Sequence, residues 1–332
     1  MVTQREKANV DLLGLQDEFF VMLKGKGRSI NTLKNYRTDL DCFNKYLKDV
    51  AKNERLDISG FSIPEIQEYG HFLEKKYNSD NSRRRRVQAL RMFFDYLVEE
   101  KVFATNPVRK IPTSPKFLDI PRPTPFVDVK TLWQFLLEES VSKQPMVRLI
   151  AKRNICTLLF IYGAGLKVSD LSQLKVDQLH LDGETPRVLI NPPKRDPYTV
   201  PLPKIFVEVY KDYAKTLVTM KRDSNTKFDS VLFNANPYRI LSGGLSSRGI
   251  EIIFEEFRKK LMINCTAKSL RQACIFKWLK QKHKDSQIKE WLGLAPSYNL
   301  KMYKEHLSNH AHEDGFLEEL YLHFVRKGLH RR

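Results

Sequence analysis

The sequence has no long hydrophobic run and few cysteines. No apolar stretch reaches the roughly 18 residues needed to cross a bilayer, and the first seven residues lack the apolar core of a secretion signal. The four cysteines show no paired spacing of the kind used for metals, and they lie among apolar residues: Cys42, Cys156, Cys265 and Cys274. We therefore expect a cytoplasmic protein without a membrane partner, whose cysteines are reduced thiols of the core.

Acidic residues are scarce relative to basic ones. Against 57 Lys and Arg stand 39 Asp and Glu, which gives a net charge of +18 and a pI near 9.6. Such an excess favours a polyanionic partner, with nucleic acid first and an anionic membrane surface second. The 332 residues contain no internal repeat and give room for two domains, each with its own core.

The N-terminal third predicts a helical domain. Ser29 and Thr32 offer N-cap side chains to one helix, and the Ser62–Glu65 segment has the capping-box pattern of another. Arg83, Arg84, Arg85 and Arg86 then lead into a third helix. Four consecutive residues span more than one helical turn, so these arginines cannot all face the core. A solvated face would explain them, but in so basic a chain we favour phosphate contacts.

A proline-rich segment divides the chain. Five prolines follow one another within a short stretch: Pro112, Pro115, Pro121, Pro123 and Pro125. Proline at this density lacks the amide donors of regular structure and favours an extended connector. We expect an N-terminal domain over residues 1–111, a linker over 112–126 and a C-terminal domain over 127–332.

The C-terminal part predicts a mixed but mostly helical domain. An amphipathic helix is expected from about Asp128, and the β-prone runs 188–190 and 198–202 predict a hairpin. The segment 316–324 has the spacing of an amphipathic terminal helix. The fold class is therefore mainly α (α+β), with a small β-sheet in the second domain.

The stretch from Lys268 to Tyr303 carries the chemistry. Arg271 follows Lys268 by three residues, and Tyr303 lies in a basic, polar setting further on. Tyrosine is a weak nucleophile unless cations stabilise the charge on it or on its target. An arginine fork suits two phosphate oxygens, and a lysine can donate a proton to a leaving group. These residue types fit attack of a tyrosine on a DNA phosphodiester.

Three ordered motifs resemble those of the tyrosine site-specific recombinases, the Xer-like phage integrase family. Lys268 and Arg271 match a His/Lys-x-x-Arg box, and 292–294 match Leu-Gly-His, with Tyr303 nine residues after position 294. The segment 163–171 resembles the family's Gly-x-Gly-Leu-Arg-x-Ser-Glu-Leu box. The opening Ser29, Thr32 and Tyr36 and the run 89–97 resemble the small helical, SAM-like core-binding domain. The resemblance covers about residues 10 to 325.

This resemblance implies a two-domain clamp around double-stranded DNA and a 3′-phosphotyrosine intermediate on Tyr303. Arg271 and Lys167 would stabilise the pentavalent transition state, and Lys268 would hydrogen-bond the phosphate. Lys194 on the hairpin would protonate the 5′-oxygen, although its register is offset by one. Arg195 remains an alternative, and so does a hairpin-tip lysine without a catalytic task.

The resemblance also suggests partners and DNA contacts. We expect a homo-oligomer, a tetramer on DNA, possibly with a second recombinase subunit, in a nucleoid-associated location. Arg195 and Arg248 are further candidate DNA contacts. The terminal helix would either close its own core or dock on a neighbouring protomer. No metal or other cofactor is expected, and His306, His310 and His312 lack ligand partners at matching spacing.

Two positions depart from the family pattern. Lys167 stands in place of an arginine, which loses the bidentate fork. Leu294 stands in place of a histidine or tryptophan that donates a hydrogen bond to the phosphate, a loss of about 10²-fold or more in rate. The active site is thus expected to be degenerate and its activity reduced. The alternative is a recombinase-fold protein that binds DNA as an architectural or accessory factor. A generic RNA binder is hard to reconcile with three ordered boxes.

Overall fold

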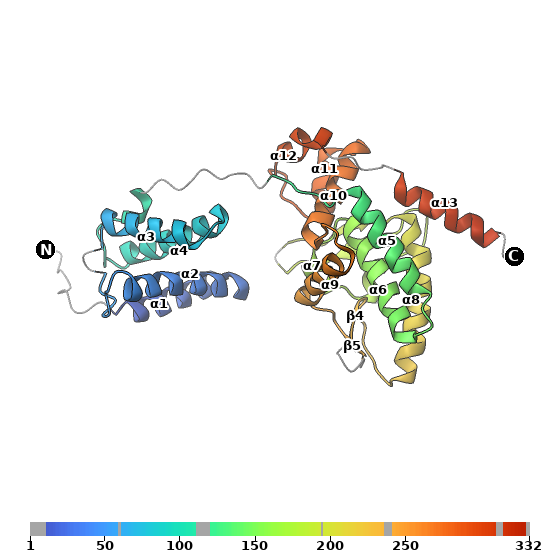
Figure 1. Cartoon of the computed structure of the whole chain (residues 1–332), viewed down its shortest axis with the longest axis horizontal. Coiled ribbons are helices and arrows are strands. Elements are labelled where there is room, and N and C mark those ends of the chain that lie inside the picture. The colour runs from blue at the N-terminus through green and yellow to red at the C-terminus, as the bar shows by residue number, and fades with distance from the viewer. Residues whose placement is uncertain are drawn as a thin grey trace. The chain divides into compact units, whose positions relative to one another are not determined.

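The computed structural model describes residues 11–58, 61–110, 120–193, 195–235, 241–309 and 315–329, with side chains to residue 323. The chain forms two compact units, Met1–Phe117 and Leu118–Arg332 (Figure 1). This division falls inside the connector predicted at 112–126. The prolines at 112 and 115 lie outside the described residues, and the exact limits of the domains stay a prediction.

The first unit is helical throughout its described part. Its elements are α1 (Leu12–Gly25), α2 (Ile30–Asp49), α3 (Ile63–Lys76), α4 (Asp80–Glu99) and the short 3-10 helix η1 (Pro107–Lys110). The predicted cap of α2 is confirmed, because the Ser29 hydroxyl accepts a hydrogen bond from the Thr32 amide at 3.2 Å. At α3, the Glu65 carboxylate accepts from the Ser62 amide at 2.9 Å, as the capping-box pattern predicts.

Aromatic rings form much of the core of this unit. Phe43 of α2 packs edge-on against Tyr69 of α3 with ring centroids 5.1 Å apart, and Phe93 of α4 packs against Phe19 of α1 at 5.5 Å. Such edge-to-face pairs add specific geometry to the burial of apolar area. The rings therefore hold all four helices to one core.

The second unit is mostly helical, with two small sheets. Its helices are α5 (Phe126–Ser140), α6 (Pro145–Leu158), η2 (Leu159–Gly163, a π-helical turn), α7 (Val168–Leu171), η3 (Val176–Gln178), α8 (Lys204–Asp223), α9 (Ser247–Leu261), α10 (Ala267–Lys280), α11 (Asp285–Trp291), α12 (Lys301–Glu305), η4 (Leu307–Asn309) and α13 (Phe316–Leu329). The expected mainly helical fold with a small sheet is confirmed.

The predicted hairpin is present. Strands β2 (Arg187–Ile190) and β3 (Tyr198–Pro201) pair antiparallel, with Val188 opposite Val200, and both of these side chains are fully buried. A third strand, β1 (Leu179–His180), joins the edge of β2. The ribbon of β4 (Phe233–Ala235) and β5 (Leu241–Gly243) is separate. Neither β1 nor this ribbon was predicted, because two or three residues are too short to show alternation.

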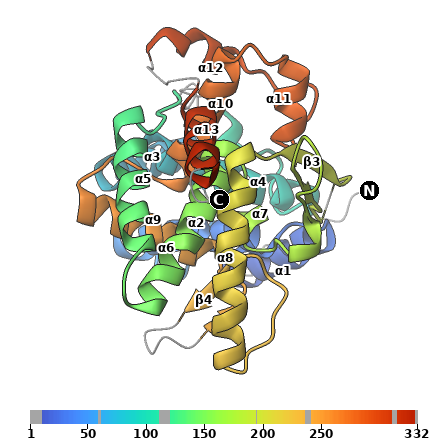
Figure 2. The same ribbon diagram turned by 90° about the vertical axis from the view of Figure 1, so that its right-hand side faces the viewer.

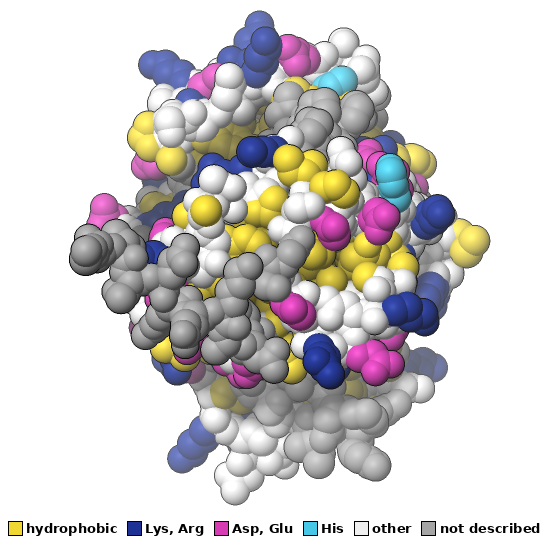
Figure 3. Space-filling model, turned by 90° about the vertical axis from the view of Figure 1, so that its left-hand side faces the viewer, with side chains coloured by type: hydrophobic (Ala, Val, Ile, Leu, Met, Phe, Trp, Pro, Cys, Tyr) yellow, Lys and Arg dark blue, Asp and Glu magenta, His cyan; other side chains and the backbone are white. Residues whose placement is uncertain are grey.

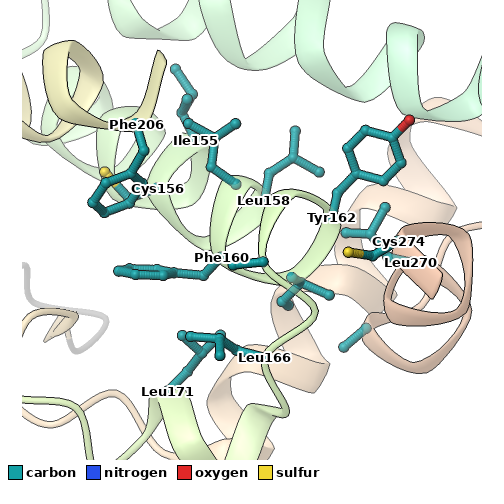
Figure 4. Packing of buried hydrophobic residues seen from close by; sticks show 14 of the residues in the cluster. Ile155, Cys156, Leu158, Phe160, Tyr162, Leu166, Leu171, Phe206, Leu270 and Cys274 are labelled. Atoms are coloured by element: carbon teal, nitrogen blue, oxygen red, sulfur yellow. The ribbon is translucent and has the colours of Figure 1, made fainter. Parts of the chain in front are cut away.

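The core of the second unit is built around α6 and η2. Figure 4 shows Phe160 and Tyr162 pointing to opposite sides of this segment. Phe160 packs against Phe206 of α8 with ring centroids 4.6 Å apart. Cys156 and Cys274 are both buried in this cluster, as are Cys42 and Cys265 elsewhere, and all four are free thiols.

The terminal helix α13 packs on its own unit. Figure 2 shows it over α5 and α8, and the ring of Phe316 lies 5.3 Å from that of Phe126 and 6.2 Å from that of Trp133. Leu317 is buried and lies close to Gly163. Of the two alternatives for this helix, the structure therefore has the one in which it closes its own core.

A lysine is buried where α10 meets η2. Lys277 is only 5% exposed, and its Nζ donates to the Gly163 carbonyl at 3.4 Å and lies 5.2 Å from the centre of the Tyr162 ring. Burial lowers the pKa of Lys277, while the charges of Cys274 and Glu318 act in the opposite direction. The folded protein thus holds this proton less tightly than the unfolded chain does.

Replacing Lys277 with methionine should remove a destabilising, pH-dependent contribution. Between the folded and the unfolded pKa the unfolded state binds more protons, so wild-type stability gains with rising pH, and Lys277→Met lacks this gain. At neutral pH the variant should be as stable as wild type or more stable. Urea unfolding followed by tryptophan fluorescence reports this unit, because Trp133, Trp278 and Trp291 all lie in it.

The exposed Lys259 of α9 provides the control, since Lys259→Met should leave the pH dependence unchanged. A Lys277→Met protein that is less stable than wild type by the same amount at neutral and alkaline pH would contradict this prediction. Its hydrogen bond and ring contact would then outweigh the cost of burying the charge.

Candidate active site

Arg271 joins two segments that lie far apart in the sequence. It lies on α10, whose first turn is capped by Thr266, the hydroxyl of which accepts from the Ser269 amide at 3.0 Å. Its Nε donates to the Gly165 carbonyl at 2.6 Å, and one terminal nitrogen donates to the Leu292 carbonyl at 3.3 Å. Burial lowers the pKa of Arg271, which the charges of Asp170 and Tyr303 oppose. The guanidinium thus holds the glycine box and the segment 292–294 together.

The glycine box can fold this way because of its glycines. Gly165 has φ +65°, and a Cβ on it would lie 2.9 Å from the Trp278 ring. Lys167 follows at the N-cap of α7, where its amide donates to the Asp170 carboxylate at 3.2 Å. Burial, and then the charge of Arg271, lowers the pKa of Lys167, while Asp170 opposes them. The electrostatic effect places Lys167 and Arg271 in one neighbourhood.

Three of the predicted cations line one pocket of about 490 Å³. Lys167, Lys268 and Arg271 surround it, and Arg258 of α9 adds a fourth positive charge. Phe254 and Leu166 form part of an apolar wall, and Glu251 and Glu255 line the side formed by α9. Four cations around one hollow suit an anionic group such as a phosphodiester. Sequence reasoning missed Arg258, because nothing in its local pattern separates it from other basic residues of α9.

Tyr303 lies next to this cluster. It is part of α12, it is half-buried, and its ring packs 5.5 Å from that of Phe276 on α10. Its charge when ionised raises the pKa of Arg271, so the two side chains share one electrostatic environment. The structure therefore brings Tyr303, Arg271, Lys167 and Lys268 to one region of the second unit.

Leu294 brings no polar group to this region. It is half-buried and packs against the hydrophobic core, and its amide donates to the Lys289 carbonyl at 2.8 Å. The preceding Gly293 has φ +57°, and a Cβ there would lie 2.6 Å from the hydroxyl oxygen of Tyr198. The segment is therefore closely fitted to β3 of the hairpin.

The hairpin tip is only partly visible. Lys194 lies outside the described residues. Arg195 is exposed, and its positive charge lowers the pKa of Lys167 and of Tyr198. Arg195 is thus near enough to the cluster to act on it.

The arginine run of α4 is held largely within its own unit. Arg86 is only 8% exposed, and its guanidinium lies 3.7 Å above the centre of the Tyr77 ring. This corrects the prediction of a phosphate contact for Arg86, since helical periodicity turns one of four consecutive residues inward. Arg85 is exposed and pairs with the buried Asp39 at 2.9 Å, and Arg83 pairs with Asp80. Arg84, half-buried, donates to the Asn81 side chain at 3.0 Å.

Basic side chains do not form one block on every face. In Figure 3, hydrophobic side chains gather near the middle of the visible face, and Lys and Arg lie mostly toward its margin. Arg248 is exposed and pairs with Glu251 at 3.3 Å and with Glu255 at 3.0 Å. A DNA contact by Arg248 would therefore have to compete with these carboxylates.

The histidines near Tyr303 do not form a described metal site. His306 is half-buried, while His310 and His312 lie outside the described residues. Among the described residues, no group of three His, Cys, Asp or Glu side chains is placed to hold a metal. A search of the same residues found no helix with the length and apolar character of a membrane span.

Comparison with known proteins points in one direction. Residues 17–101 match the family described as "Phage integrase, N-terminal SAM-like domain". The tyrosine recombinase XerD of Listeria innocua is 28% identical over 251 residues, which cover 71% of this chain and 78% of that protein. The tyrosine recombinase XerC of Oceanobacillus iheyensis is 23% identical over 300 residues, covering 87% of this chain and 90% of that protein.

Solved structures show the same fold. The XerH site-specific recombinase bound to palindromic difH substrate, in a post-cleavage complex, matches with a TM-score of 0.67 at 15% identity, covering 93% of this chain and 89% of that one. A lambda integrase dimer bound to a COC' core site matches with a TM-score of 0.65 at 17% identity, covering 92% and 80%. At these identities the likeness concerns the fold.

Proposed function

We propose that this chain, a member of the tyrosine recombinase and phage integrase family, is a site-specific recombinase that cleaves and rejoins DNA through Tyr303. The observation that carries the assignment to Tyr303 is the position of Arg271. Its guanidinium bridges the glycine box and the segment 292–294, beside Tyr303 and in a pocket that it shares with Lys167 and Lys268.

In the first step, the Tyr303 oxygen forms a bond to the phosphorus, and the bond from phosphorus to the 5′-oxygen breaks. The tyrosine loses its proton, and the 5′-oxygen gains one from Lys194 or Arg195. Arg271 and Lys167 hold the non-bridging oxygens, where negative charge develops in the transition state. Lys268 donates a further hydrogen bond to the phosphate. Rejoining runs these steps in reverse, because the phosphotyrosine keeps the energy of the broken bond.

Double-stranded DNA is the proposed partner, and the protein would assemble on it as a homo-oligomer. Among the proteins of similar fold, lambda integrase has been solved as a dimer on a core site and as a tetramer on a Holliday junction. The net charge of +18 supports binding to the DNA backbone. Arg83, Arg84, Arg195 and Arg248 remain candidate contacts to it, and a second recombinase subunit would be a further partner.

A second candidate function rests on Leu294. It replaces a hydrogen-bond donor and packs on the core, and Lys167 lacks the fork of an arginine. A protein with this site would bind the DNA and react slowly or not at all. It would then act as an architectural or accessory factor.

The test uses a nicked suicide duplex that carries the native site, recovered from the host as DNA bound to the protein. The wild-type protein should form a covalent adduct that survives a denaturing gel. Mass spectrometry should find the nucleotide on the peptide that contains Tyr303. Tight, salt-sensitive binding without any adduct, together with an adduct formed by Leu294→His, would favour the binding role instead.

A further inference from the structure

A phenol lies beside the position that has lost its hydrogen-bond donor. Tyr198 is the first residue of β3, opposite Ile190 of β2, and it is half-buried. The mechanism above gives it no task. Its hydroxyl nevertheless lies against the segment that carries Leu294.

The contact is with the backbone of Gly293. A Cβ built on Gly293 would lie 2.6 Å from both the hydroxyl oxygen and the ring carbon Cζ of Tyr198. Only a residue without a side chain leaves room for the phenol here. Because Gly293 and Leu294 are consecutive, the Tyr198 hydroxyl reaches the neighbourhood of position 294 from the hairpin side.

The same phenol lies among the charges of the active site. Burial, and then the charge of Asp170, raises the pKa of Tyr198 to about 12, while Arg271 and Arg195 lower it. The phenol therefore keeps its proton at neutral pH and can donate it in a hydrogen bond. Within the described part of the chain, no group accepts a hydrogen bond from this hydroxyl.

We propose that the Tyr198 hydroxyl donates a hydrogen bond to a non-bridging oxygen of the scissile phosphate, and so supplies the donor that Leu294 lacks. This inference rests on the proposed function of Tyr303. Tyr198 acts only as a hydrogen-bond donor, and its proton stays on the phenol throughout. Arg271 and Tyr198 would then approach the phosphate from α10 and from β3.

The first test is Tyr198→Phe, which keeps the ring against Gly293 and removes only the hydroxyl. The rate of adduct formation on the suicide duplex should fall about 10²-fold, the scale found for one lost donor to a developing oxyanion. Affinity for the intact site should stay unchanged. Tyr210→Phe is the matched control, because Tyr210 is also half-buried but stacks on Phe206 within α8, and its rate should equal that of wild type.

The second test adds Leu294→His to both proteins. If both side chains serve the same oxygen, the histidine should restore much of the rate in Tyr198→Phe and add little to wild type, so that the two changes are strongly non-additive. A Tyr198→Phe rate equal to that of wild type would overturn the proposal, and so would a Leu294→His gain of the same size in both backgrounds. If wild type forms no adduct on Tyr303, the proposed function fails first, and the role of Tyr198 falls with it.

Discussion

Tyr303→Phe is expected to form no covalent adduct with DNA. Removal of a catalytic nucleophile costs on the order of 10⁶-fold in rate, which here places the reaction below detection. The phenylalanine keeps the ring contact with Phe276, which lies 5.5 Å away, so the fold and the affinity for DNA should remain. The measurement is the suicide-duplex assay, with binding followed in parallel by gel shift.

Tyr298→Phe is the matched control. Tyr298 is 42% exposed and lies five residues before Tyr303, in the loop between α11 and α12. It should react as wild type does. An adduct that persists in Tyr303→Phe would mean that another residue is the nucleophile, and the nucleotide-bearing peptide would identify it.

Arg271→Lys should have the second-largest effect. A lysine keeps the charge but cannot donate to the Gly165 carbonyl, the Leu292 carbonyl and a phosphate in one planar fork. We expect adduct formation to fall by about 10³-fold, the upper range for one lost electrostatic donor. DNA affinity should fall much less, because many other cations contact the backbone.

The reciprocal change provides the comparison. Lys167→Arg gains a fork in the same pocket and should raise the rate of adduct formation, with an unchanged requirement for Tyr303. Equal rates for Arg271→Lys and wild type would show that the guanidinium is structural and does not act on the phosphate. Its hydrogen bonds to two backbone carbonyls make that outcome a fair test.

Local rules predicted much of the fold. Ser29 and Glu65 form the hydrogen bonds that their capping patterns predict, and the hairpin of β2 and β3 forms where β-prone runs flank a turn. These features depend on neighbours within a few residues, which a sequence displays directly. The short β1 and the β4–β5 ribbon depend instead on partners from the rest of the fold.

The site divides in the same way. Lys268, Arg271 and Tyr303 were recognised from motifs, and the structure brings them together with Lys167. Arg258 and Tyr198 belong to no motif, and their relevance comes from which surfaces α9 and β3 turn toward the pocket. Arg86 was assigned to the DNA although it lies on Tyr77 in the interior, because a run of like charges hides which member faces inward.

The π-helical turn η2 limits how the length of this chain can change. Its Leu159 carbonyl accepts from the Ala164 amide five residues on, at 3.2 Å, so the turn holds one residue more than an α-helix would. Loss of any single residue here would let α6 continue as an ordinary helix and rotate everything that follows by about 100°. Lys167 would then leave the pocket, whereas most substitutions would keep it in place. In evolution, a one-codon deletion in this turn should therefore be much rarer than a substitution.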